Sequence, residues 1–119
     1  MLAVGERMLG DLDERTQKMA TGFSGGIGST HRDLCGALTG GVMVIGGLFG
    51  RTRPEEDESH CLRVSTRYRD QFSQAFGSPI CNELRAVKYG SQGEQPCWVL
   101  VETATRILLD VLDDAQQPG

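Results

Sequence analysis

The residues of this chain best suited to chemistry are its four cysteines, Cys35, Cys61, Cys81 and Cys97. No two of them form a Cys-x-x-Cys pair, so a zinc ribbon and a thioredoxin-type motif are absent. Cys35, Cys81 and Cys97 each fall in the first turn or so of a predicted helix. The partial positive charge and free N–H groups of a helix N-terminus favour a thiolate over a thiol. These three cysteines are therefore the candidate catalytic residues.

The remaining potential ligands have simpler interpretations. Cys61 lies on the apolar face of a predicted helix, where a free cysteine is usually a small buried hydrophobe. His60 beside it is predicted to be exposed. His31 precedes Cys35 by four residues, which on one helix would place both side chains on the same face for an ion pair or a metal clip. The alternative is that His31 precedes the helix and meets solvent.

Hydrophobic spacing predicts a run of helices. Asp11 or Asp13 caps the first clear one, which ends near residue 20. The other predicted helices span residues 31–49, 55–76, from Ser78-Pro79 to about 87, and 96 to about 115, with a glycine-rich loop at 22–30 and a polar loop at 88–95. The predicted fold class is all-α, a compact bundle of five or six helices in one domain, 1–119. The apolar runs 42–49 and 98–101 could instead be buried strands.

Glycine is concentrated around the first of these cysteines. Ten of the 16 glycines lie between Gly22 and Gly50. Because glycine destabilises a helix interior by roughly 0.5–1 kcal/mol relative to alanine, its retention there indicates close backbone approach. The uncharged run Leu34–Phe49 is shorter than the roughly 20 residues of a membrane span. We therefore predict a glycine-rich central helix, buried in the core, and no membrane span.

Composition narrows the function classes. The chain has 119 residues and a formal charge of −4, which argues against a nucleic-acid partner. The N-terminal residues reach Glu6 and Arg7 too early for a signal peptide. We therefore predict a cytoplasmic protein, a compartment in which structural disulfides are unusual. Its cysteines are then reactive, metal-binding or simply buried.

Several segments together resemble a known family. The segment Cys35-Gly36-Ala37-Leu38-Thr39-Gly40, preceded by the glycine-rich segment 22–28, is similar to the C_GCAxxG_C_C family of putative redox-active proteins. Phe76-Gly77-Ser78 with Cys81-Asn82-Glu83-Leu84 looks like the third cysteine region of that family, and Cys97 like the fourth. The resemblance covers nearly the whole chain.

The resemblance also implies what this chain lacks. Family members carry a further cysteine in an N-terminal helix, and Met1–Glu6 looks like the remainder of that helix. Either the true start lies upstream or this member has lost the residue. Members of the family often lie near transporter genes, which implies a transporter-associated partner.

The resulting hypothesis is a cytoplasmic redox-active protein that uses clustered thiols of Cys35, Cys81 and Cys97. These thiols would cycle between dithiol and disulfide, or hold a metal or iron–sulfur centre with His31 as a further candidate ligand. Glycines 36, 40 and 41 would let the helices approach closely enough for the cysteines to meet. The alternative is a non-catalytic helical structural or interaction protein, such as a homodimer, with buried cysteines. The sequence names neither a cofactor nor a redox partner.

Overall fold

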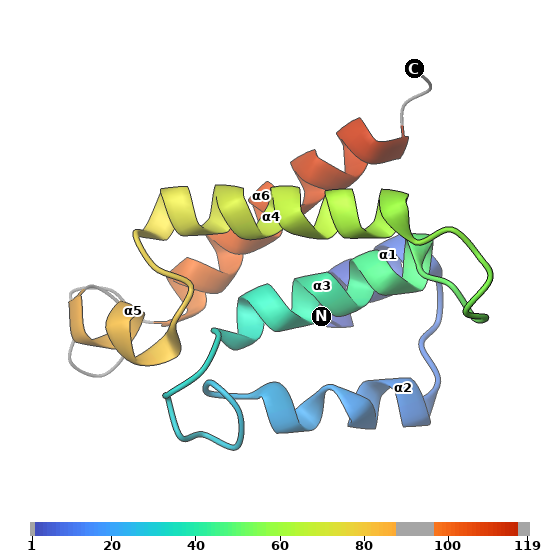
Figure 1. Cartoon of the computed structure of the whole chain (residues 1–119). Coiled ribbons are helices and arrows are strands. Elements are labelled where there is room, and N and C mark those ends of the chain that lie inside the picture. Colours follow the sequence, from blue (N-terminus) through green and yellow to red (C-terminus); the bar gives the residue numbers. More distant parts are fainter. Residues whose placement is uncertain (1, 88–96, 117–119) are drawn as a thin grey trace.

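The chain is a bundle of helices, which confirms the predicted all-α class (Figure 1). The computed structural model describes residues 2–87 and 97–116, and the side chains of residues 4–84 and 98–116. Within these residues there are six α-helices, one 3-10 turn and no strand. Their bounds are α1 Leu2–Leu9, α2 Glu14–Met19, η1 Thr21–Phe23, α3 Gly36–Phe49, α4 Ser59–Phe76, α5 Cys81–Val87 and α6 Cys97–Gln116.

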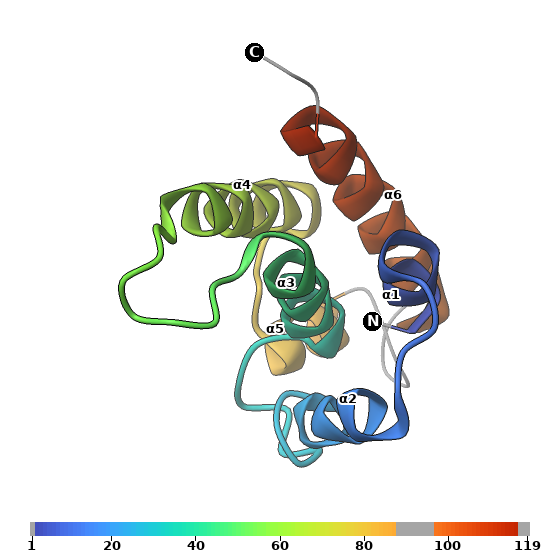
Figure 2. The same ribbon diagram turned by 90° about the vertical axis from the view of Figure 1, so that its right-hand side faces the viewer.

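Helix α3 packs against α1, α4 and α6, and Figure 2 shows it between these neighbours. Its buried side chains include Leu38, Val44 and Ile45. The apolar stripes predicted for the two long helices meet it, and their fully or nearly buried members are Val64, Tyr68, Phe72, Leu100, Ala104, Leu108, Val111 and Leu112. Both runs proposed as alternative strands, 42–49 and 98–101, are helical. Burial of these stripes is the main stabilising term of the fold.

Two glycines of α3 make room for side chains of the neighbouring helices. A Cβ atom added at Gly41 would lie only 2.9 Å from Cζ of Tyr68 on α4. A Cβ at Gly47 would lie 2.7 Å from Cδ1 of Leu9 on α1. Gly46, in contrast, faces open space. Among the described residues no helix is both long and apolar enough to span a membrane.

Helix boundaries follow capping chemistry, with one correction. The Asp13 carboxylate accepts a hydrogen bond from the Thr16 N–H at 2.7 Å, as expected for an N-cap. Gly77 ends α4 with a φ of 84°. The prediction that α4 begins at residue 55 was wrong, because the Asp57 carboxylate accepts from the Ser59 N–H at 3.0 Å and holds a turn that precedes the helix. The predicted loop 88–95 lies outside the described residues.

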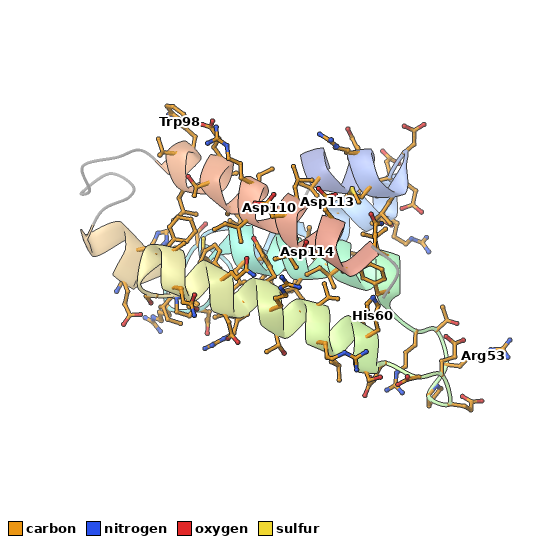
Figure 3. The ribbon with its side chains drawn as sticks, turned by 90° about the horizontal axis from the view of Figure 1, so that it is seen from above. Arg53, His60, Trp98, Asp110, Asp113 and Asp114 are labelled. Carbon is orange, nitrogen blue, oxygen red and sulfur yellow. The ribbon has the colours of Figure 1, made fainter. Side chains whose placement is uncertain are left out.

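The two long helices are also joined across their surface. Arg67 on α4 donates to the Asp114 carboxylate on α6 at 2.7 Å, and Figure 3 shows Asp114 on the side of α6 that faces α4. Trp98, at the beginning of α6, points away from α4 and is 64% exposed. Because the ion pair is itself half exposed, it contributes little to stability.

Candidate functional site

The candidate site begins with a backbone contact between two segments that are distant in the sequence. Leu34 and Ile80 form an isolated antiparallel β-bridge. The Cys35 N–H donates to the Pro79 carbonyl at 2.8 Å, and the Cys81 N–H donates to the Asp33 carbonyl at 2.9 Å. The segment before α3 therefore lies beside the segment before α5, which Figures 1 and 2 both show.

This bridge places Cys35 and Cys81 on the same side of the paired backbones. Side chains alternate between the two faces of an antiparallel pair, so residues 35 and 81 share one face while Leu34 and Ile80 share the other. Burial agrees with this arrangement, since Leu34 is 39% exposed and Cys81 only 8%. Cys35 is half-buried. The bridge thus turns two cysteines toward the interior of the bundle.

The two cysteines are diagonal neighbours across the bridge. In an antiparallel pair, the Cα atoms of such neighbours are about 7–8 Å apart. A disulfide requires Cα atoms within about 7 Å. The spacing of an ideal antiparallel pair is thus close to this limit.

Both cysteines begin helices, as the sequence predicts. Cys35 is the N-cap residue of the 14-residue helix α3, and its side chain makes no capping hydrogen bond. Cys81 is the first residue of α5. Cys97 is the first residue of α6, but its side chain lies outside the described residues. The predicted convergence of all three sulfur atoms therefore stays a prediction.

His31 contacts Cys81 rather than Cys35. Its Nδ1 atom lies 3.4 Å from Sγ of Cys81, within hydrogen-bond distance for sulfur. The predicted pairing of His31 and Cys35 on one helical face was wrong, because α3 begins at Gly36 and His31 has a φ of 61°. The Asp33 carbonyl, which a longer helix would use internally, instead accepts the hydrogen bond from Cys81. A thiol beside an imidazole is a Cys–His pair of the kind that activates a nucleophile.

The loop before His31 is built against Cys81. Five consecutive residues, 25–29, have positive φ values between 57° and 68°. Such values suit glycine but are unfavourable for Ile27, which is β-branched. A Cβ at Gly26 would lie 2.8 Å from Cβ of Cys81, so only glycine fits. The Thr30 hydroxyl closes the loop by donating to the Gly26 carbonyl at 2.8 Å.

Tyr68 is a member of the site that the sequence did not identify. The helical spacing of the sequence places it only on the apolar stripe of α4, yet its hydroxyl donates to the Ala37 carbonyl at 3.0 Å. Burial, followed by the negative charge of a Cys35 thiolate, raises the pKa of Tyr68 far above its usual value. The phenol therefore stays protonated beside Cys35. The sequence did hold a signal for this contact, namely a tyrosine at a predicted buried position of α4. A buried phenol needs a hydrogen-bond partner, and a neighbouring glycine-rich helix offers one.

Cys61 and His60 belong to a different region. Cys61 is partly buried against the core, as predicted, near the beginning of α4. Cys81 follows the other end of α4, and the rise of 1.5 Å per residue separates the two ends by more than about 20 Å. His60 is exposed, as predicted, although its ring contacts Phe49 with centroids 4.6 Å apart. Cys61 is thus too far away to act with Cys81.

A metal centre finds no support in the described part of the chain. Among those residues, no group of three or more His, Cys, Asp or Glu side chains is arranged to hold a metal ion. The side chain of Cys97, a further candidate ligand, lies outside the described residues.

Three of the described helices have a cysteine at the N-terminal end, and one of these cysteines, Cys81, contacts a histidine. The model of the C_GCAxxG_C_C family, described as putative redox-active protein, matches residues 1–111. The chain belongs to this family. No curated protein and no solved structure matches it.

Proposed function

We propose that this protein carries out thiol–disulfide exchange, with Cys35 as the attacking thiol and Cys81 as the resolving thiol. The observation that carries the proposal is the pairing of residues 33–35 with 79–81, which puts both cysteines on one face with His31 at 3.4 Å from Cys81. Membership of a family described as redox-active supports the same class of chemistry.

The assignment of roles follows from exposure and from helix position. Cys35 is the more exposed thiol and caps a helix of 14 residues, whose dipole favours a thiolate. Cys81 is only 8% exposed, so an incoming disulfide reaches Cys35 first. His31 can accept the proton of Cys81 when that thiol is needed.

The proposed exchange consumes one external disulfide. The Cys35 thiolate attacks one sulfur of the partner disulfide, forms a mixed disulfide and releases the other sulfur as a thiolate. Cys81 loses its proton to His31, and its thiolate then attacks Sγ of Cys35. The bond from Cys35 to the partner breaks, and the partner leaves as its second thiolate. The protein dithiol is oxidised by two electrons and the partner disulfide is reduced by two.

Peptide mapping after oxidation tests this proposal. The reduced protein is treated with a small disulfide, quenched with an alkylating agent and digested for mass spectrometry. We expect the Cys35–Cys81 linkage in the wild type and in Cys61→Ser. In Cys81→Ser we expect a mixed disulfide trapped at Cys35. A dominant linkage from either cysteine to Cys97 in the wild type would contradict the assignment of Cys81 as the resolving thiol.

A pair of histidine variants tests the role of His31. We expect His31→Ala to slow resolution of the mixed disulfide at Cys35 near neutral pH by about 100-fold, which is the lower end of the range for general-base catalysis. His60→Ala is the matched control and should leave the rate unchanged, because His60 contacts Phe49 and lies at the far end of α4. Equal rates for the two variants would remove His31 from the mechanism.

A further inference from the structure

One edge of the Leu34–Ile80 bridge is open. The hydrogen bonds of this bridge join residues 35 to 79 and 81 to 33, so the N–H and C=O groups of Leu34 and Ile80 point away from each other. On the Ile80 side both groups are used, because its N–H donates to the Ser78 hydroxyl at 3.1 Å and its carbonyl accepts from the Leu84 N–H at 3.1 Å. On the Leu34 side, neither group has a hydrogen-bond partner in the described part of the chain.

This open edge lies beside the proposed attacking thiol and carries the exposed apolar side chain of Leu34. Leu34 is 39% exposed and immediately precedes Cys35. A backbone donor and acceptor in an extended residue form the template to which another extended chain adds.

We propose that Leu34 binds an extended segment of a disulfide-bearing polypeptide as an added antiparallel strand, so that the protein prefers polypeptide disulfides to small ones. This inference rests on the proposed thiol–disulfide exchange and names the substrate class of that site. The residue opposite Leu34 exchanges two backbone hydrogen bonds with it.

The register of such a strand determines where its cysteine lies. The substrate residue before the one paired with Leu34 stands opposite Cys35, in a non-hydrogen-bonded pair. The Cα atoms of such a pair are about 4.5 Å apart, within the roughly 4.4–6.8 Å that a disulfide spans. The substrate cysteine therefore belongs opposite Cys35, and the residue after it pairs with Leu34. That residue shares the outer face with Leu34 and Ile80, which favours an apolar side chain there.

The chemical step is the one described above, with the polypeptide as the oxidant. The Cys35 thiolate attacks the substrate sulfur opposite it, and the other sulfur of the substrate disulfide leaves as a thiolate. Cys81 then displaces the substrate cysteine from Cys35 as a second thiolate. The added strand holds the substrate through the first displacement and dissociates after the second.

The test uses a six-residue peptide with alternating valine and threonine and one cysteine, which carries 2-nitro-5-thiobenzoate as a mixed disulfide. Release of the coloured thiolate measures the attack by Cys35. One analogue is N-methylated at the residue after the cysteine, which removes the N–H that would donate to the Leu34 carbonyl. The matched control is N-methylated one residue further on, where the N–H points away from Leu34.

We expect the unmodified peptide and the control to react about fivefold faster than the first analogue, since the one backbone hydrogen bond that it loses contributes on that scale when of ordinary strength. Equal rates for all three peptides would overturn the proposal. The same assay with the mixed disulfide of free cysteine needs no added strand and tests the proposed function separately. If the mixed disulfide of free cysteine reacts as fast as the peptide, only the proposed strand addition is refuted. If neither compound reacts, the proposed thiol–disulfide exchange itself is refuted.

Variants of the protein add an independent measurement. Leu34→Pro removes the N–H of residue 34, whereas Leu34→Ala keeps it. We expect the proline variant to lose the advantage of the peptide over free cysteine, and the alanine variant to retain most of it. A proline variant that keeps the advantage would contradict the proposal. If the proline variant does not fold, the N-methylated peptides still decide the question.

Discussion

The helical core and the loop of residues 25–35 both depend on glycine, but for different physical reasons. In the core, Gly41 has ordinary helical geometry, and its lack of a side chain makes room for the Tyr68 ring. In the loop, Gly26 has a φ of 68° and also lies against Cβ of Cys81. The core therefore needs a small residue at position 41, whereas the loop needs a residue at position 26 that is small and also tolerates a left-handed backbone conformation.

The core and the loop also differ in how regular their hydrogen bonds and contacts are. The core is built from hydrogen bonds within each helix and from apolar stripes that repeat at helical spacing. The loop is held by contacts between residues far apart in sequence, such as the bonds from Cys35 to Pro79 and from Cys81 to Asp33. A change in the core should thus alter global stability, and a change in the loop should alter the thiol site first.

The largest expected effect is in the core. Gly41→Leu should destabilise the fold by about 1–3 kcal/mol, because the new side chain overlaps the buried Tyr68 ring and forces repacking. Gly46→Leu is the matched control in the same helix, where a Cβ meets nothing within 4 Å. We expect that control to be neutral or to gain up to about 1 kcal/mol from helix propensity. Urea denaturation measures both, and equal destabilisation would show that close packing at Gly41 is unimportant.

The corresponding change in the loop is Gly26→Ala. The alanine would carry the left-handed penalty of about 1–2 kcal/mol and would also press against Cβ of Cys81 at 2.8 Å. Gly28→Ala carries only the first cost, since Gly28 has a φ of 60° and open space around it. Alkylation of Cys81 in the native state should become faster in the Gly26 variant than in the Gly28 variant. A reversed order would contradict the packing of the loop on Cys81.

Tyr68 connects the two regions, and its removal should have a smaller effect. Tyr68→Phe loses the hydrogen bond to the Ala37 carbonyl and should cost about 1 kcal/mol at neutral pH. Because folding raises the pKa of Tyr68, the wild type keeps this contribution below about pH 10 and loses it as the pH rises above that value. Denaturation across this range should show the difference between wild type and variant shrinking with pH. A constant difference would mean that the tyrosine titrates equally in both states.

The smallest expected effect is a gain in stability. Ile27→Gly removes a β-branched residue from a φ of 65° and should stabilise the protein by up to about 1 kcal/mol. The side chain is 47% exposed, so little burial is lost. Thermal melting measures the change. A loss of stability would show that Ile27 makes contacts worth more than its backbone strain.

The sequence determined the helical class and most of the core. The spacing of Val64, Tyr68 and Phe72 predicts the buried face of α4, and these residues are buried. It also indicated that Cys35, Cys81 and Cys97 begin helices, because capping residues and glycines mark helix ends locally. These features depend on residues only a few positions apart, which is why they can be predicted from one sequence.

Only the tertiary structure decided which residues share the site. Helical spacing paired His31 with Cys35, but the Cys81 N–H takes the Asp33 carbonyl, α3 begins at Gly36, and His31 turns to Cys81 instead. No local pattern encodes a bridge between Leu34 and Ile80, 46 positions apart, since it joins the segments at the ends of two helices, α3 and α4, that pack together. Spacing along one helix is fixed by its geometry, whereas the partner of a loop carbonyl is chosen by the whole fold.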